Sequence, residues 1–312
     1  ELPAELLPIT SEIVVDLYTG MPQIRYYNDK GQIAYCVTLN GTADWERFRL
    51  ENDPYNDLYN VSINTGYLHE AYVTKFFYDS AGKLIRSSGM EHVYDFYPDD
   101  YYGNEYEPLS IFYGNLTYKY ENDLIKAYDN SGSFRFAMDN DWNIISGNTF
   151  DAEYTYNNRG QITGINLNAP MWYFEVKISY DSNGNITDYN EIEHDIQDNG
   201  RIDELTYEHF KKYTYEDGRM TGFTDSDFSS CPWLFSYDSN NQVSGLQVKD
   251  LKFGNYSTDH YEKDPSAIPH DHYSSWNYKF EGTQENGTWV PTIQTSIGGD
   301  RRINKTFTVP SR

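Results

Sequence analysis

The sequence predicts an all-β protein: an antiparallel meander of repeated β-hairpins that forms a long curled sheet or a barrel-like structure. A short pattern of Tyr, Asp or Asn, Gly and an aliphatic residue recurs along the chain. The residues that flank it alternate with the period of two that β-strands show. Tyr accounts for 31 of the 312 residues and aromatic residues for 17%, whereas disordered chains are poor in aromatic residues. We therefore expect a folded protein built from hairpins.

Each copy of the repeat has the form of a β-hairpin. Clear copies are TYNNRGQI at 155–162, SYDSNGNI at 179–186 and, with Asn in place of Gly, SYDSNNQV at 236–243. An Asp or Asn followed three residues later by Gly is typical of a type I turn that ends in a residue with positive φ, which Gly adopts without steric cost. We expect hairpin turns with positive φ at five glycines, the last of them in a copy that is one residue shorter: Gly31, Gly82, Gly160, Gly184 and Gly218.

In three copies a second glycine interrupts the strand that follows the turn. The sequences are ITGI at 162–165, MTGF at 220–223 and VSGL at 243–246. Because a spacing of three breaks the strand period, we expect either a β-bulge or close packing of a neighbouring aromatic ring over the glycine. We also expect the repeat tyrosines to form a ladder on one face of the sheet. These tyrosines are Tyr156, Tyr180, Tyr215 and Tyr237.

The repeat organises most of the chain. We expect residues 1–25 to be an N-terminal tether or edge segment, and residues 26–312 to be one repeat domain, because no linker or composition shift divides them. Two segments, near 95–108 and 259–275, lack strand alternation and carry Pro, Tyr and acidic residues. We expect both to be long loop insertions.

Helix is expected to be scarce. Helical periodicity is confined to stretches near 43–51 and 201–213, and the second also fits a strand. The chain contains no run of 18 apolar residues, so we expect no transmembrane segment.

Charge and cysteine content restrict the compartment and the partners. The formal net charge is −24, which disfavours nucleic acid and anionic membrane surfaces because both would repel the chain. The chain begins with Glu1 and not Met, so we expect that a leader was removed. Cys36 and Cys231 lie far apart in the sequence. Two separate thiols are the preferred interpretation, and a disulfide is the alternative if the fold brings them together.

The repeat resembles a known family. Four units, YTYNNRGQITGI at 154–165, ISYDSNGNITDY at 178–189, YTYEDGRMTGF at 213–223 and FSYDSNNQVSGL at 235–246, resemble the YD (tyrosine–aspartate) repeats of the RHS class. They also look like the short repeat-bearing secreted lipoproteins of Bacteroidetes. The resemblance implies hairpins that coil as a sheet, a location at the bacterial cell surface or in the periplasm, and a lipid anchor upstream of Glu1. It implies no catalytic residues, and the chain is too short for the toxin-enclosing shell of full RHS proteins.

One stretch resembles a calcium-binding loop. DIQDNGRID at 195–203 places Gly200 at the sixth position of an EF-hand loop, but Gln197 and Thr206 occupy positions three and twelve, where carboxylates are wanted. We interpret the stretch as a hairpin turn, with calcium as the alternative.

The densest histidine cluster is the candidate zinc site. Its members are His260, His270 and His272. Imidazole and carboxylate ligands suit zinc or another transition metal, but the His-x-His spacing is unspecific, so a polar loop is the preferred interpretation. We expect no resident cofactor.

Tyrosine-rich segments are the main candidates for ligand binding. Flat rings beside carboxylates and amides suit carbohydrate stacking or a protein interface. The alternative is that these rings pack the sheet and cap its ends. The candidates are Tyr97, Tyr101, Tyr102, Tyr106, Tyr261, Tyr273 and Trp276.

These features favour a non-catalytic extracytoplasmic β-repeat protein that binds a glycan or another protein at the cell envelope. The sequence lacks the nucleophile, zinc-protease, phosphate-loop and dinucleotide motifs. The alternatives are a polysaccharide-acting enzyme without a recognisable motif and a purely structural envelope spacer. Two facing carboxylates in a cleft would indicate the enzyme.

Overall fold

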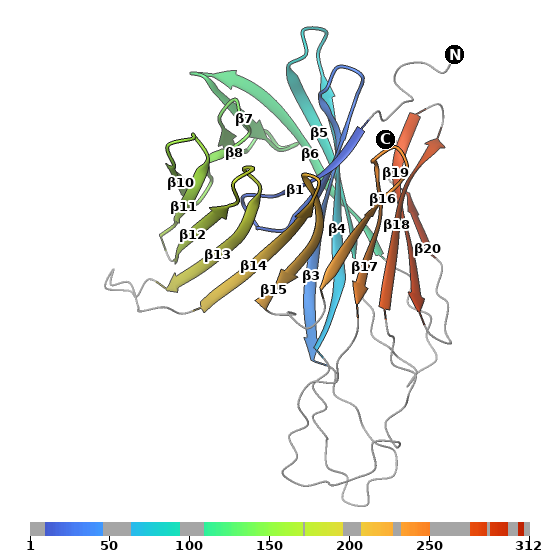
Figure 1. Cartoon of the computed structure of the whole chain (residues 1–312). Helices are drawn as coiled ribbons and strands as arrows, with labels where there is room; N and C mark the ends of the chain where they lie inside the picture. The colour runs from blue at the N-terminus through green and yellow to red at the C-terminus, as the bar shows by residue number, and fades with distance from the viewer. Residues whose placement is uncertain are drawn as a thin grey trace, which may run out of the picture.

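The described residues form one twenty-stranded antiparallel sheet in which each strand pairs with the next along the chain (Figure 1). The computed structural model describes residues 10–45, 64–93, 109–170, 172–195, 207–226, 232–249, 275–285, 288–298 and 305–308. The strands are β1 (Thr10–Val15), β2 (Pro22–Tyr27), β3 (Ile33–Trp45), β4 (Asn64–Tyr78), β5 (Leu84–Val93), β6 (Leu109–Glu121), β7 (Leu124–Tyr128), β8 (Phe134–Met138), β9 (Ile144–Gly147), β10 (Asp151–Tyr156), β11 (Ile162–Asn168), β12 (Trp172–Tyr180), β13 (Ile186–Asp195), β14 (Tyr207–Glu216), β15 (Arg219–Asp225), β16 (Trp233–Tyr237), β17 (Val243–Lys249), β18 (Ser275–Glu285), β19 (Thr288–Gly298) and β20 (Lys305–Thr308).

The predicted all-β meander is confirmed. Among the described strands β1 and β20 do not pair with each other, so the sheet is curled and open and does not close into a barrel. β2 continues across residue 25, where the sequence places the start of the repeat domain.

The helical interpretation of 201–213 is wrong for the described part of that stretch, which belongs to β14. Successive residues there alternate in burial: Lys211 and Tyr213 are buried, whereas Lys212 is exposed. This period of two reflects a strand with one face on the core. Of the other helical stretch, residues 43–45 are the end of β3, and the rest lies outside the described residues.

The repeat turns share one hydrogen-bonding scheme, except the shorter turn between β14 and β15, where Asp217 and Gly218 both have positive φ, 50° and 76°. In the turn of Asn157, the N–H of Gly160 donates to the Asn157 carbonyl at 3.0 Å. The Asn157 side-chain Oδ1 accepts the N–H groups of Arg159 at 2.9 Å and Gln161 at 3.0 Å. The same pattern recurs at Asn28, Asp79, Asp129, Asp139, Asp181 and Asp238. The repeat therefore uses Asp or Asn because one side-chain oxygen satisfies two backbone donors of the turn.

The residue at the end of each turn has the predicted backbone conformation. The φ angles are 74°, 80°, 77°, 93° and 76° at Gly31, Gly82, Gly160, Gly184 and Gly218. Asn241 replaces Gly with a φ of 63°. At the equivalent position of the hairpin of β8 and β9 stands Trp142, with a φ of 70°. Its ring packs on Phe76 with centroids 5.2 Å apart, so tertiary packing holds a residue that local preference disfavours.

One hairpin falls outside the sequence pattern. The segment YDNSGSF at 128–134 forms the same turn between β7 and β8, at the opposite ends of the strands from the turn of Asn157. It has Phe134 where the pattern requires an aliphatic residue. An aromatic residue starts a strand as well as an aliphatic one does, so the pattern was too narrow at that position.

Removing the side-chain oxygen from one turn is expected to weaken the fold moderately. We predict that Asn157→Ala lowers the free energy of unfolding by about 1–2 kcal/mol, because two backbone donors lose their acceptor. Asn157→Asp keeps the acceptor and is the matched control. Urea denaturation of both variants checks the prediction, and an equal loss in both would contradict it.

The second glycine of the repeat lies at a β-bulge, as one of the two expectations states. The register shifts so that Thr155 pairs with Gly164 while Tyr156 pairs with Ile162, which leaves Thr163 as the extra residue. The same shift occurs in the hairpins of β14 with β15 and of β16 with β17. It also occurs in hairpins without the second glycine, such as β4 with β5 and β12 with β13, so the bulge belongs to the repeat and does not depend on that glycine. The side chain that packs over Gly164 is the Thr155 hydroxyl, since a Cβ there would lie 2.6 Å from Thr155 Oγ1. An aromatic ring does not occupy that place.

The repeat tyrosines join successive hairpins through their hydroxyl groups. Tyr180 donates to the carbonyl of Ile162, the first residue of the second strand in the preceding hairpin, at 2.6 Å. Tyr237 donates in the same way to Met220 at 2.7 Å, and burial raises the pKa of Tyr237 to about 12. Tyr78 donates likewise to Ile33. These rings lie partly buried against the core, as the ladder predicts.

Tyr156 is an exception to the ladder, because its side chain is 55% exposed. β9 and β10 pair in a register shifted by two residues relative to the other hairpin junctions, with Asp151 opposite Ser146. Tyr154 consequently takes the position next to the preceding hairpin and donates to the Ile144 carbonyl at 2.6 Å. Tyr156 extends beyond that hairpin into solvent.

The sheet is rolled so that opposite faces are buried in different places. Val73 of β4 belongs to a first core, whereas Phe76 and Tyr78, on the other face of the same strand, pack against a second core. The first core also includes Ile24, Val37, Ile165, Val176, Tyr189, Phe223 and Trp233. The second consists of Leu84, Tyr118, Ile125, Ala127 and Met138. β1–β4 therefore pack against the outer strands β10–β19. Figure 1 draws these blue and cyan strands between the yellow and the orange ones.

Candidate functional site

All but one of the sequence-predicted ligand residues lie outside the described residues. This applies to Tyr97, Tyr101, Tyr102, Tyr106, Tyr261, Tyr273, His260, His270 and His272. Trp276 belongs to β18, where it pairs with Val248 and Ile297. Most of the EF-hand-like stretch also lies outside the described residues. The glycan, protein and metal assignments therefore stay predictions.

The strands begin and end along two opposite sides of the sheet, which we call its edges, and these two edges carry different connections. In an antiparallel meander alternate connections share an edge. The repeat turns after β2, β4, β10, β12, β14 and β16 therefore lie at one edge. The two tyrosine-rich segments are flanked by strand ends that lie at the other edge. These strand ends are Val93 and Leu109 for the first segment, and Lys249 and Ser275 for the second. In Figure 1 the arrows of β3 and β17 point toward this second edge, at the bottom of the view.

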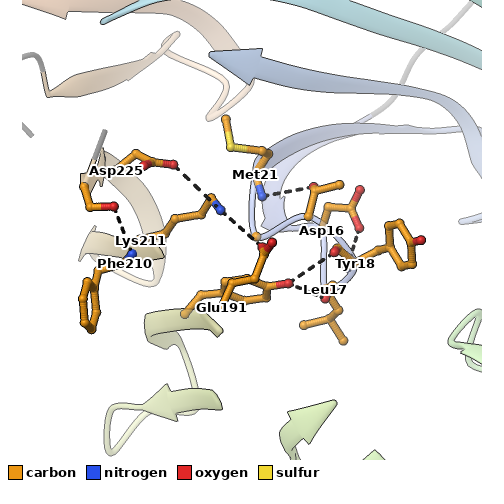
Figure 2. Close-up of polar contacts among 12 residues, drawn as sticks. Asp16, Leu17, Tyr18, Met21, Glu191, Phe210, Lys211 and Asp225 are labelled. Atoms are coloured by element: carbon orange, nitrogen blue, oxygen red, sulfur yellow. Dashed lines mark hydrogen bonds and ion pairs between the residues drawn. The ribbon is translucent and has the colours of Figure 1, made fainter. Parts of the chain in front are cut away.

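The densest polar constellation in the described part of the chain surrounds the loop between β1 and β2. This N-terminal loop, Asp16–Met21, closes on itself: the N–H of Asp16 donates to the Met21 carbonyl at 2.9 Å and the N–H of Gly20 to the Asp16 carbonyl at 2.7 Å. Asp16 Oδ1 accepts the N–H of Tyr18 at 2.9 Å, and Thr19 Oγ1 accepts the N–H of Met21 at 3.2 Å. The loop is thus a preformed turn, shown at the right of Figure 2.

Two tyrosines of the outer strands hold this loop by its backbone. The Tyr189 hydroxyl lies 3.2 Å from the carbonyl oxygens of both Leu17 and Tyr18. The Tyr213 hydroxyl donates to the Gly20 carbonyl. Gly20 has a φ of 68°, and a Cβ there would lie 2.6 Å from the Tyr189 ring. Only glycine fits both the conformation and the space at this position.

A buried lysine lies beside the loop. Lys211 is 7% exposed, and its Nζ lies 3.7 Å from Glu191 Oε2 and 3.8 Å from Asp225 Oδ2 (Figure 2). The cross-strand register brings them together, because Tyr189 pairs with Lys211 and Lys211 pairs with Asp225. The Nζ also lies 5.5 Å from the centre of the Tyr189 ring. We name Glu191, Lys211 and Asp225 the Lys211 cluster.

Burial decides the protonation states in this region. It raises the pKa of the Asp16 carboxyl, and the lowering effects of the Tyr18 N–H and of the Arg25 charge do not outweigh it. Burial also raises the pKa of Tyr189 and Tyr213 well above the usual range. Both phenols are therefore neutral donors at physiological pH. The arrangement is chemically suited to hold a backbone turn over a buried ion pair.

Sequence reasoning missed this site. Asp16 and Lys211 come from segments that carry no shared motif, and the hydrogen bond from Tyr213 joins residues 193 positions apart. The one local hint is Lys211, a charged residue at a core-facing position of β14 between Tyr207 and Tyr213.

The described ranges contain no candidate metal site, and the one cysteine among them is buried. There, no group of three or more His, Cys, Asp and Glu side chains is placed to hold a metal ion. Cys36 is a buried free thiol whose pKa is raised by burial. Cys231 lies outside the described residues.

Within the same ranges no helix has the length and apolar character needed to cross a membrane.

Comparison with known proteins identifies no family for this chain. No family model matches the sequence, and no curated protein matches it. Among solved structures, a porin-like protein from Bacteroides uniformis ATCC 8492 is 11% identical, with a TM-score of 0.33 over 88% of this chain and 94% of that chain. A TcdB2-TccC3-TEV chain is 10% identical, with a TM-score of 0.19 over 92% of this chain and 21% of that chain. Neither similarity is close enough to bear on function.

Proposed function

We propose that the chain is a non-catalytic extracytoplasmic binding module, which presents glycan- or protein-contacting residues from the edge of the sheet opposite the repeat turns. The observation that carries this proposal is the difference between the two edges. At the turn edge, the Tyr, Asp or Asn, and Gly residues of the repeat hold the hairpins together. Both tyrosine-rich segments are flanked by strand ends at the other edge.

The proposed location is the bacterial cell surface or the periplasm, with a lipid anchor upstream of Glu1. The YD-repeat resemblance of the sequence supports it. The net charge of −24 is consistent with a partner that is neutral or cationic, and neutral sugars meet that requirement.

The test is a glycan array on the purified protein, followed by variants. We predict that the double variant Tyr101→Ala/Tyr102→Ala weakens binding of the identified glycan about tenfold or more, since loss of aromatic contacts removes on the order of 1–2 kcal/mol. Tyr156→Ala is the matched control, because Tyr156 is an exposed tyrosine at the turn edge. An equal loss in the control, or no loss in the double variant, would contradict the proposal.

The protein-partner form of the proposal is tested with the same variants. If the array detects no glycan, chemical crosslinking to an envelope extract replaces it, and the double variant should lose the crosslinked partner that Tyr156→Ala retains. The two alternatives predict other results. An enzyme would release reducing ends from the polysaccharide it binds, and a structural spacer would show no binding that either substitution changes.

A further inference from the structure

One face of β4–β7 carries a row of residues that pair directly across the strands. Phe77 of β4 pairs with Arg86 of β5, and Arg86 pairs with Thr117 of β6. Thr117 in turn pairs with Tyr128 of β7. Directly opposed residues of antiparallel strands share one face of the sheet. The neighbouring Tyr118 packs into the second core, so the row lies on the other face of these strands, where Thr117 is exposed.

Two cations of this face lie over aromatic rings. The Arg86 Cζ lies 3.9 Å from the centre of the Phe77 ring, and the Lys119 Nζ lies 4.6 Å from the centre of the Tyr128 ring. An aromatic ring attracts a cation within about 6 Å of its centre, so the rings restrain both side chains. Arg86 and Lys119 are diagonal neighbours on adjacent strands, with Cβ atoms about 7–8 Å apart. We name Phe77, Arg86, Thr117, Lys119 and Tyr128 the cationic face.

Neither cation has an anionic partner in the part of the chain that the structure describes. There, the side chains of Arg86 and Lys119 form no ion pair and no hydrogen bond. Glu121, an acidic residue on the same face of β6, is held by Lys126 Nζ at 2.8 Å. Lys75 adds a third cation, 5.2 Å from the ring on which Arg86 lies. The chain has 48 acidic residues for 24 Lys and Arg, so adjacent cations without a carboxylate are the reverse of what its composition favours.

We propose that the cationic face binds a polysaccharide that carries carboxylate groups. The guanidinium of Arg86 offers a planar fork of N–H donors that matches a carboxylate, and the ammonium group of Lys119 offers a second, compact charge. Between them, the Thr117 hydroxyl is suited to hydrogen bonds with sugar hydroxyls. Ser88 and Asn115, which pair with each other on the same face, extend this polar surface. The site goes beyond the proposed function, because it uses none of the tyrosine-rich residues.

Other anionic partners fit the cationic face less well. β5 and β6 are each paired on both sides, so a peptide cannot add to the sheet there as a strand. Nucleic acid and anionic membranes present dense negative charge, which the net charge of −24 opposes. A polysaccharide with one carboxylate per sugar is less densely charged. Because charges farther away than about 8 Å are largely screened at physiological ionic strength, the distant acidic residues do not prevent its binding.

Isothermal titration calorimetry of the full-length protein with polygalacturonate and alginate oligosaccharides tests the proposal. We predict that at least one of them binds, that its affinity falls as the salt concentration rises, and that the methyl-esterified form does not bind because its carboxyl groups are neutral. Failure of both oligosaccharides to bind, or equal binding of the ester, would overturn the proposal. Tighter binding of heparin would assign the face to sulfate groups and would also overturn it.

The double variant Arg86→Gln/Lys119→Gln is expected to weaken binding about tenfold or more, because charge-assisted hydrogen bonds to the ligand are lost. Its matched control is Lys177→Gln/Arg219→Gln, which removes the same charge elsewhere. Both control residues already have carboxylate partners two positions away in the chain, at 3.2 Å for Lys177 and 4.0 Å for Arg219. Equal losses in the two double variants would reduce the effect to net charge and overturn the proposal.

Two further variants keep the result unambiguous. Lys119→Gln alone changes an exposed residue, so it decides the test if urea denaturation shows that the double variant is destabilised; we expect affinity to fall about threefold. Tyr101→Ala/Tyr102→Ala should bind the carboxylated oligosaccharide as the parent protein does, because the cationic face assigns no contact to these residues. A loss there would move the binding to the tyrosine-rich segment, which overturns this inference and leaves the proposed function standing.

Discussion

Replacing Lys211 with Met is expected to lower the free energy of unfolding at pH 7 by about 3 kcal/mol. The substitution removes the cation that Glu191 and Asp225 share, and the Asp225 carboxylate, whose side chain is 6% exposed, stays in the interior of the roll. Breaking a buried ion pair by removing one partner typically costs about 3–5 kcal/mol, and the separations of 3.7 and 3.8 Å place this pair at the lower end. Urea denaturation followed by tryptophan fluorescence measures the loss.

The control for Lys211→Met is Lys212→Met on the same strand. Lys212 is exposed, so we expect a change below about 0.5 kcal/mol there. An equal loss in Lys212→Met would show that the ion pairs do not stabilise the fold.

Phe223→Ala is expected to destabilise the protein by about 3–5 kcal/mol, the usual range for truncating a buried aromatic residue. Phe223 is 1% exposed, and its ring centre lies 5.6 Å from that of Tyr213 and 5.2 Å from that of Trp233. The truncation would leave a cavity at the point where β14, β15 and β16 meet, next to the tyrosine that holds the N-terminal loop.

Phe210→Ala is the matched control for the Phe223 prediction. Phe210 lies on neighbouring β14, but its side chain is 45% exposed on the outer face. We expect a loss of less than about 1 kcal/mol. Thermal or urea unfolding of the two variants compares them directly. Similar losses would mean that the rolled core is less tightly packed than the structure indicates.

The candidate ligand residues follow no local sequence rule of this kind. The sequence places the aromatic candidates in segments without strand periodicity, and ligand specificity depends on where such side chains meet in space. For example, no short-range sequence pattern tells whether Tyr97 and Tyr261 lie close together. Their assignment to a glycan or protein surface remains a prediction for the binding experiments.

The amino-acid sequence by itself determined the hairpins. The interactions that define each turn join residues within six positions, so a short pattern contains all of them. Asn157 and Gly160 illustrate this: the amide oxygen satisfies its own turn, and the glycine supplies the positive φ. The bulge at Thr163 follows from the same few residues.

Only the tertiary structure decided how the hairpins roll and which face of each is buried. β4 is apolar on both faces, so its sequence could not show that Val73 and Phe76 belong to different cores. The register between hairpins is set by contacts across a junction, which is why Tyr154 and not Tyr156 meets the preceding hairpin. The N-terminal loop lies against Tyr189 and Tyr213 because rolling brings residues more than 170 positions apart into contact. No periodicity within a strand encodes such a contact, since it depends on the accumulated twist and curl of all the strands between.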